Sequence, residues 1–385
     1  MLNFTYCNPV NIVFGKGTIS QLSLLIDPKA KILLTYGGGS IIKNGVYRQV
    51  KNALKKHNVV EFGGIEPNPV YETLMKAVEL GRKKKIDFIL AVGGGSVLDG
   101  SKFIAAAIPY KGKDCWKILQ THGAVVQSAL PLGDVLTLPA TGSEMNPVAV
   151  ISRKSTAEKL FFGSPLVYPV FSILDPQTTY SLPKNQLRNG LVDAFVHVIE
   201  QYLTVDLNTP VQDGFAETIL KTLVDIAPVI MSGKKDYSVR ATFMWAATQA
   251  LNGILSRGVI EDWSTHMIGH EVTAFFGLAH AETLAILLPA VWKYEFRTKT
   301  DKLAMMAQNV WGIKKGSKKQ KAAAAIDRTV KFFHSINMPT RLRDFGITQK
   351  DVQKVVNRFT QTGDILGENK DIGAKAVRKI LNMCL

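Results

Sequence analysis

The sequence is poor in cysteine and has no long apolar run. Its three cysteines, Cys7, Cys115 and Cys384, lie far apart and form no CxxC pair. This spacing argues against a cysteine metal site and is typical of a reducing compartment, so we expect a cytoplasmic protein. No stretch approaches the roughly 18 uninterrupted apolar residues that a membrane helix needs. The N-terminus also lacks the basic and apolar regions of a signal peptide, so we expect no membrane association.

Acidic residues are scarce too: 31 Asp and Glu stand against 47 Lys and Arg, which gives a net charge of +16. Such a charge has two interpretations: a surface that binds nucleic acid, or a lysine-rich solvated surface that suits phosphate-bearing ligands. The basic runs are Arg82–Lys85, at the end of an expected helix, and Lys314–Lys321, in an expected loop. Neither contains the interleaved aromatic residues of a base-stacking surface. We therefore favour the solvated surface and expect no nucleic-acid partner.

The chain is longer than most chains that fold around a single hydrophobic core, so two domains are expected. Its hydrophobic pattern changes near residue 180. Residues 1–180 alternate short apolar runs with helical patterns, which predicts an α/β domain with a parallel sheet covered by helices. Its expected helices include Tyr71–Lys83 and Val97–Ala107. Its expected strands are Asn11–Phe14, Lys31–Tyr36, Val59–Phe62, Asp87–Val92, Asp134–Leu138, Val148–Ser152 and Phe171–Leu174.

Residues 181–385 contain long amphipathic patterns and almost no strand signal, so we expect a second, all-α domain. Pro183 suits the first turn of its first helix. The expected helices include Gln186–Leu203, Val211–Met231, Val239–Ser256, Trp263–Phe275, Thr283–Tyr294, Ala322–Ile336 and Lys350–Phe359.

Two glycine clusters follow predicted strands. Gly37–Ser40 and Gly93–Ser96 both read GGGS directly after an apolar run, and the second opens the helical stretch VLDGSKFIAAA. Glycine lets the backbone approach a ligand closely, and a helix N-terminus offers free N–H groups to an anion. One such cluster is compatible with an ordinary tight turn, but two at strand ends favour a nucleotide diphosphate site. Neither matches the GxGxxG fingerprint, and the hydroxyl-rich Thr137–Glu144 adds only a weak signal.

The absence of Asp and Glu near the first glycine cluster predicts which nucleotide the protein prefers. Enzymes that bind NAD usually place a carboxylate near a strand end, where it holds the ribose 2′-hydroxyl. No Asp or Glu occurs from Pro28 to Val60, and Ser40, Lys43 and Arg48 lie near the first glycine cluster. A 2′-phosphate is repelled by a carboxylate and held by hydroxyl and cationic groups, so this pattern favours NADP. The alternative is that Lys43 and Arg48 only form the solvated side of a helix.

Five potential metal ligands are concentrated in the second domain. Asp193 and His197 lie four residues apart, as do His266 and His270, and His280 follows ten residues later. Residues four apart on a helix share one face, and a carboxylate with imidazoles is a normal ligand set for a divalent cation. A single histidine here would more often be a core or capping residue, but the concentration favours a metal site. A catalytic metal keeps one position open, so we expect one histidine to stay off the metal.

Several segments together resemble a known family over essentially the whole chain. They are FGKG, YGGGS, GGIEPNP, AVGGGSVLDGSKFIAAA, TLPATGSE, NGLVDAFVHVIEQY, MWAATQALNG, THMIGHE, HAETLAILLPA and GENKDI. They resemble the iron-containing, or group III, alcohol dehydrogenases, and most closely their NADPH-dependent aldehyde reductase and butanol dehydrogenase branch. The resemblance implies a dehydroquinate-synthase-like, dinucleotide-binding N-terminal domain and a helical, metal-binding C-terminal domain.

The resemblance also implies roles for individual residues. It implies one divalent metal per chain, Fe²⁺ or Zn²⁺, and leaves His270 near the substrate as a proton-handling or positioning group. Family members that prefer NAD carry an Asp at the position of Gly39, so its absence agrees with NADP. The implied metal ligands are Asp193, His197, His266 and His280. The cofactor contacts expected from the glycine clusters and the resemblance are Gly37, Gly38, Gly39, Ser40, Asn68, Gly94, Gly95, Ser96, Asp99, Thr137, Thr141 and Lys159.

The activity that the resemblance implies is reversible, NADPH-dependent reduction of aldehydes to primary alcohols. The metal would polarise the carbonyl for hydride transfer. The implied partners are a small aldehyde or alcohol and a second copy of the chain in a homodimer. One rival is a dehydroquinate-synthase-like or glycerol-dehydrogenase-like enzyme, which shares the glycine clusters but not THMIGHE with HAETLAILLPA. The other rival, a non-enzymatic nucleic-acid-binding protein, is motivated only by charge.

Overall fold

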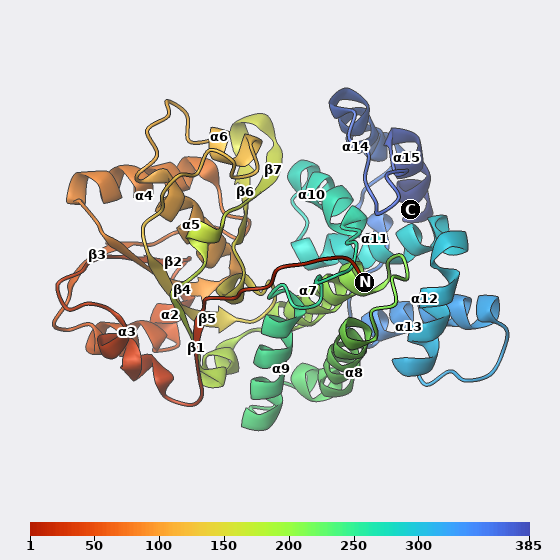
Figure 1. The fold of residues 1–385 in the computed structure, drawn as a ribbon, viewed down its shortest axis with the longest axis horizontal. Coiled ribbons are helices and arrows are strands. Elements are labelled where there is room, and N and C mark those ends of the chain that lie inside the picture. The colour runs from red at the N-terminus through yellow and green to blue at the C-terminus, as the bar shows by residue number, and fades with distance from the viewer. The chain divides into compact units, whose positions relative to one another are not determined.

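The chain forms two compact units in the computed structural model, which describes residues 1–385 (Figure 1). The first, here the α/β unit, contains Cys7–Pro183 and Lys235–Thr248. The second, here the helical unit, contains Met1–Tyr6, Lys184–Lys234 and Gln249–Leu385. The boundary expected at residue 180 stays a prediction. No helix in either unit combines the length and the apolar character that crossing a bilayer requires.

A six-stranded parallel sheet forms the centre of the α/β unit, in the order β1-β8-β5-β4-β2-β3. Its middle strands read as apolar runs because both of their faces are buried. The sequence predicts all six strands, and the α/β fold class is confirmed. The strands are β1 (Asn11–Phe14), β2 (Lys31–Tyr36), β3 (Asn58–Phe62), β4 (Phe88–Gly94), β5 (Leu132–Leu138) and β8 (Phe171–Leu174).

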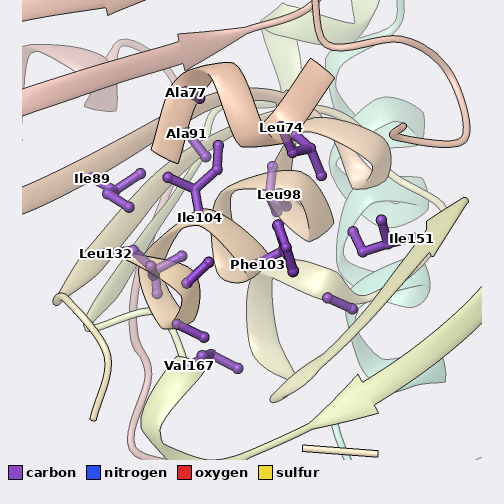
Figure 2. Packing of buried hydrophobic residues seen from close by; sticks show 14 of the residues in the cluster. Leu74, Ala77, Ile89, Ala91, Leu98, Phe103, Ile104, Leu132, Ile151 and Val167 are labelled. Atoms are coloured by element: carbon purple, nitrogen blue, oxygen red, sulfur yellow. The ribbon is translucent and has the colours of Figure 1, made fainter. Parts of the chain in front are cut away.

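Helices cover both faces of this sheet. Leu98 and Ile104 of α5 pack with Ile89 of β4 in one apolar cluster, as Figure 2 shows. The next residue of β4, Leu90, points to the opposite face and packs with Val50 of α3. Burying a side chain of this size contributes roughly 1.5–3 kcal/mol. The helices of this region are α1 (Leu22–Leu25), α2 (Ser40–Lys43), α3 (Val46–Ala53), α4 (Tyr71–Lys84), α5 (Gly95–Ala107) and α6 (Lys117–Gln120).

The strand predicted at Val148–Ser152 lies outside the parallel sheet. It is β6 (Val148–Arg153), which pairs antiparallel with β7 (Glu158–Gly163), a strand that the sequence analysis does not predict. A tight turn joins them, in which Ala157 has a left-handed backbone with φ 49°. The expectation that this segment belongs to the parallel sheet is therefore wrong, because a connection this short permits only an antiparallel neighbour.

The helical unit contains helices and one isolated β-bridge, between Leu366 and Ile372. Its helical character is confirmed, although α12 and α15 are absent from the predicted set. Most of α9 belongs to the α/β unit, and α9 ends at Ala250, before the left-handed Gly253 with φ 89°, and not at Ser256. The helices are α7 (Lys184–Tyr202), α8 (Pro210–Ser232), α9 (Tyr237–Ala250), α10 (Ser264–Phe276), α11 (His280–Tyr294), α12 (Phe296–Asn309), α13 (Lys318–Ser335), α14 (Gln349–Thr362) and α15 (Ala374–Met383).

Candidate metal centre and nucleotide site

Helix α7 carries two of the predicted metal ligands. Asp193 and His197 lie one turn apart and are both buried. The Oδ1 atom of Asp193 lies 3.8 Å from Nδ1 of His197. That oxygen is buried and accepts no hydrogen bond. Burying a carboxylate oxygen that accepts no hydrogen bond costs free energy unless a cation faces it. The groups around Asp193 therefore show whether a cation can bind there.

The hairpin of α10 and α11 carries the three other histidines of the predicted set. α10 ends at Phe276, because the next residue, Gly277, has a left-handed backbone (φ 71°), and α11 begins at His280. The two helices approach closely at Gly269, where a Cβ would lie 3.0 Å from Oγ1 of Thr283. Glycine at this position therefore lets the first turn of α11 lie against the part of α10 that carries His266.

One carboxylate and two imidazoles converge between these helices. Ligand atoms of Asp193, His266 and His280 all lie within 4.8 Å of one another. The Nε2 atom of His280 is 3.7 Å from Oδ1 of Asp193. Carboxylate oxygen and imidazole nitrogen are donors that Fe²⁺ and Zn²⁺ both accept, so these residues fit a divalent cation. The structure thus brings together three of the four predicted ligands.

His197 and His270 lie beside this three-residue set. The ring of His197 stacks on that of His266, with centroids 4.7 Å apart and 21° between the planes. The ring centroid of His270 is 5.4 Å from that of His280. Both side chains are buried. The assignment of His197 as the fourth ligand and of His270 as a non-ligand group stays a prediction.

Trp263 packs against the same rings. Its indole meets the His266 ring edge-on at 5.2 Å and the His197 ring at 6.2 Å. It directly precedes α10 in a left-handed conformation (φ 60°), which is uncommon for a bulky residue. Such strain persists only where the surrounding structure holds it, and it is frequent at functional sites. The indole of Trp263 is therefore an apolar neighbour of the His197 and His266 rings.

Glu200 is a site residue that the sequence analysis does not identify. Its buried carboxylate is hydrogen-bonded to Nδ1 of His266 and accepts the backbone N–H of Thr265 at 2.6 Å. A signal for it exists in the sequence, because Glu200 lies two turns after Asp193 and so shares the ligand face of α7.

In the α/β unit, the two glycine clusters follow neighbouring strands. β2 and β4 pair in parallel, with Tyr36 opposite Val92, so Gly37–Ser40 and Gly93–Ser96 lie at the same end of the sheet. The chain proceeds from β2 to β3 on one side and from β4 to β5 on the other. Ligands of open α/β sheets bind where the strand order reverses in this way. The fold thus places both clusters at the expected nucleotide position.

The backbone of the second cluster is packed too tightly for side chains. A Cβ on Gly94 would lie 2.9 Å from Cβ of Leu138, and one on Gly95 would lie 2.4 Å from the side chain of Thr141. α5 starts at Gly95, two residues before its predicted start, so the free N–H groups of its first turn belong to the cluster itself. The N-terminus of a helix favours an anion, which agrees with a diphosphate at this position.

Three predicted cofactor contacts form one hydrogen-bonded group. The backbone N–H of Asn68 donates to Oγ of Ser96 at 3.2 Å, and Nζ of Lys159 donates to Oδ1 of Asn68 at 2.9 Å. Asn68 has a left-handed backbone with φ 55°. The group therefore connects β7, the loop before α4 and the second glycine cluster.

Asp99 lies on α5, one turn after the second glycine cluster, and its carboxylate is hydrogen-bonded within the protein. Its carboxylate accepts the hydroxyl of Ser143 at 2.7 Å and the N–H of Val150 at 3.0 Å. The fully buried Lys102, which the sequence analysis does not identify, donates to Ser143 at 2.8 Å and to the carbonyl of Asn146 at 2.8 Å. Burial lowers the pKa of Lys102 to about 8 and raises that of Asp99. The two side chains hold the segment after β5, where Thr141 lies. A contact of Asp99 with the cofactor stays a prediction.

Glu61, on β3, is the first acid after the acid-free stretch. Its carboxylate accepts hydrogen bonds from Lys51 at 2.7 Å, from Tyr47 at 3.0 Å and from Tyr36 at 3.5 Å. Burial opposes ionisation, but the hydrogen bonds from Lys51 and Tyr47 lower the pKa of Glu61. This carboxylate is therefore already neutralised by its neighbours, while Gly39 and Ser40 present no acid.

The chain is similar to known proteins over its whole length. Residues 9–176 match the profile described as iron-containing alcohol dehydrogenase, and residues 189–385 match that of the Fe-containing alcohol dehydrogenase family, C-terminal. The chain is 53% identical over 382 residues to the NADPH-dependent aldehyde reductase YqhD of Escherichia coli, with 99% of each chain covered. It is 43% identical over 387 residues to the NADP-dependent alcohol dehydrogenase 3 of Entamoeba histolytica, again with 99% of each covered. A crystal structure of E. coli K-12 YqhD matches it with a TM-score of 0.98 at 52% identity, covering 100% of this chain and 99% of that one.

Proposed function

The chain belongs to the iron-containing alcohol dehydrogenase family, and we propose that it reduces aldehydes to primary alcohols with NADPH and catalyses the reverse oxidation. The similarity to an NADPH-dependent aldehyde reductase and to an NADP-dependent alcohol dehydrogenase supports this activity. The reaction needs a hydride donor, a group that polarises the carbonyl and a source of one proton.

One observation carries the proposal: Asp193, His266 and His280 converge within 4.8 Å around a buried carboxylate oxygen that accepts no hydrogen bond. A divalent cation held by these residues would act as a Lewis acid on a carbonyl oxygen. We propose His197 as the fourth ligand, because it shares a helix face with Asp193 and stacks on His266. The donor set suits Fe²⁺ and Zn²⁺ alike, and the family's description names iron.

For the cofactor, the proposal assigns the diphosphate of NADPH to Gly94, Gly95 and Ser96 at the start of α5. Gly37, Gly38, Gly39 and Ser40 receive the adenosine 2′-phosphate end, because no carboxylate there repels it. The neutralised state of Glu61 supports the same preference. The remaining proposed contacts, which complete the site, are Asn68, Asp99, Thr137, Thr141 and Lys159.

His270 is the residue proposed to handle the proton. It is buried beside His280 and lies one turn from His266 on α10. Reduction leaves an alkoxide that must take up one proton, and histidine is the side chain most often used for such transfers. In this proposal His270 delivers or relays that proton, while the apolar indole of Trp263 limits the access of water.

The assembly and the location belong to the same proposal. We propose a homodimer, which rests on the family resemblance alone and is tested by light scattering coupled to size-exclusion chromatography. A cytoplasmic location suits the three free thiols, of which Cys115 and Cys384 are buried.

The test combines metal analysis of the purified protein with initial rates for a panel of aldehydes, each measured with NADPH and with NADH. We expect one divalent metal per chain and faster reduction with NADPH. A metal-loaded protein that oxidises NADPH with none of the simple aldehydes overturns the proposal. Turnover of a polyol, or of a phosphate-bearing sugar acid, would instead favour the glycerol-dehydrogenase-like or dehydroquinate-synthase-like rival.

A further inference from the structure

The carboxylate of Glu200 contacts both the side chain and the backbone of His266. Its Oε2 is hydrogen-bonded to Nδ1 of the imidazole and accepts the backbone N–H of the same residue at 3.3 Å. Its Oε1 accepts the N–H of Thr265 at 2.6 Å. Glu200 is only 3% exposed, so water does not compete for these bonds.

The bond to the ring determines which nitrogen of His266 is available to a metal. Both oxygens of the Glu200 carboxylate already accept backbone N–H groups, so the carboxylate is the acceptor here and Nδ1 of His266 carries the proton that it donates. A neutral imidazole then keeps its lone pair on Nε2, and this is the atom left for a cation. Histidines that bind metals commonly donate their other N–H to a carboxylate, which fixes the tautomer and the ring orientation.

The bonds to the backbone hold the helix that carries His266. Thr265 and His266 belong to the first turn of α10, whose N–H groups have no partner within the helix. Trp263, at the N-cap position, provides no side-chain cap, so Glu200 from α7 takes over that role. A negative charge at a helix N-terminus is also electrostatically favourable. One carboxylate therefore controls both the position of the backbone and the direction of the ring.

We propose that Glu200 is a positioning residue of the metal centre, which presents Nε2 of His266 to the cation and connects α7 to α10. This inference rests on the proposed function, because it assumes that the site of Asp193, His266 and His280 holds a metal. It adds a fifth side chain that acts without touching the metal. It also separates two parts of α7: Asp193 supplies a ligand, and Glu200 orients a ligand on another helix.

The test measures metal binding without substrate or cofactor. Glu200→Gln keeps the size of the side chain, but its amide cannot accept from both Thr265 and Nδ1 of His266 without placing an N–H₂ group against a donor. We expect the Zn²⁺ affinity, measured by competition with a chromogenic chelator, to fall by roughly 10–100-fold. The absorption spectrum of the Co²⁺-substituted protein should also change, because it reports the ligand geometry.

The matched control is Glu217→Gln, which removes a carboxylate bonded to Tyr202 at the end of α7 but touches no proposed ligand. Its Zn²⁺ affinity and Co²⁺ spectrum should equal those of the wild type.

A purely structural role for Glu200 gives a different result. If Glu200 acts through the ring of His266, then adding Glu200→Gln to His266→Ala costs little further Zn²⁺ affinity. If the two losses multiply, or if Glu200→Gln alone binds Zn²⁺ and Co²⁺ as the wild type does, the proposal is overturned.

A measurement on the wild type keeps the proposal testable should Glu200→Gln fail to fold. Long-range ¹H–¹⁵N spectra should show His266, identified by its loss in His266→Ala, with its proton on Nδ1; a proton on Nε2 overturns the proposal. A wild-type protein that binds neither Zn²⁺ nor Co²⁺ contradicts the proposed function itself. A wild-type protein that binds metal normally but reduces no aldehyde contradicts only the proposed activity.

Discussion

The two units prepare their candidate sites with different parts of the chain. In the α/β unit the site is mostly backbone: Gly94 and Gly95 bring main-chain atoms to the ends of parallel strands, and any Cβ there would overlap its neighbours. In the helical unit the site is made of side chains from α7, α10 and α11. The first kind of site is damaged by adding atoms and the second by removing them.

Removing a ligand should abolish the metal site. In His280→Ala and Asp193→Ala we expect metal affinity to fall by more than the roughly 10–100-fold typical of changes outside the ligand set. Aldehyde reduction should fall to background, because no polarising cation remains. Metal content after dialysis, measured beside activity, checks this. The control is His334→Ala, which removes an exposed histidine bonded to Thr340. If His280→Ala kept its metal while His270→Ala lost it, the ligand and the proton-handling group would have to be exchanged.

Removing a buried charge should affect the α/β unit more than truncating any of its surface residues. Lys102→Met leaves Asp99 without its buried cation and removes four hydrogen bonds that hold the segment after β5. Breaking such a buried charge network costs about 3–5 kcal/mol, so the melting temperature and the affinity for NADPH should both fall. Lys83→Met, on the exposed side of α4, is the control and should change neither. Normal NADPH binding with a lowered melting temperature would limit Lys102 to a stabilising role.

His270→Ala tests whether every histidine of the helical unit serves the metal. We expect the metal to stay bound while turnover falls by about 10²-fold, the usual effect of losing a general acid or base. Metal stoichiometry and kcat, measured on the same sample, separate the two effects. Unchanged kcat with full metal occupancy would assign proton transfer to water or to another group.

Adding an acid to the first glycine cluster should shift the cofactor preference. Gly39→Asp places a carboxylate where a 2′-phosphate is expected. The carboxylate repels that phosphate and can instead accept from the 2′-hydroxyl of NADH, a charged hydrogen bond of about 1.5–3 kcal/mol. The ratio of kcat/KM for NADPH to that for NADH should therefore fall roughly 10- to 100-fold. Gly39 has a left-handed backbone (φ 95°), so Gly39→Asn is the control, because it has similar backbone strain without the charge. A ratio that falls equally in both variants would show that strain, and not charge, changes the preference.

Neutralising surface lysines should change least. Lys314, Lys315 and Lys318 are exposed, and the ion pair of Lys318 with Asp301 is itself solvated. Replacing them in pairs by glutamine should change stability by less than about 0.5 kcal/mol and leave kcat/KM unaltered. A selective loss of turnover in a folded variant would bring this segment into contact with the cofactor or a partner, contrary to the solvated-surface interpretation.

The contrast between the two units also explains what the sequence could predict. The six parallel strands and both GGGS clusters are contiguous patterns, so they can be identified without knowing the fold. The concentration of His266, His270 and His280 was visible because the α10–α11 hairpin is local. Glu200 and Lys102 were missed, since their importance depends on partners 66 and 41 residues away. The antiparallel pairing of β6 was missed because a short apolar run does not reveal its neighbour.

The separation of the proposed metal ligands along the chain has a further consequence, for the unfolded state. Asp193 and His266 are roughly seventy residues apart, so a metal held by both closes a long loop in the chain. In polymer terms the cation is a removable crosslink, comparable to a disulfide in how it limits the conformations of an unfolded chain that retains it. Removing the metal would then lower the stability of the protein as well as its activity. Without this crosslink the unfolded chain has more conformational entropy. The supply of metal in the cell then becomes one of the quantities that determine the stability of the folded protein.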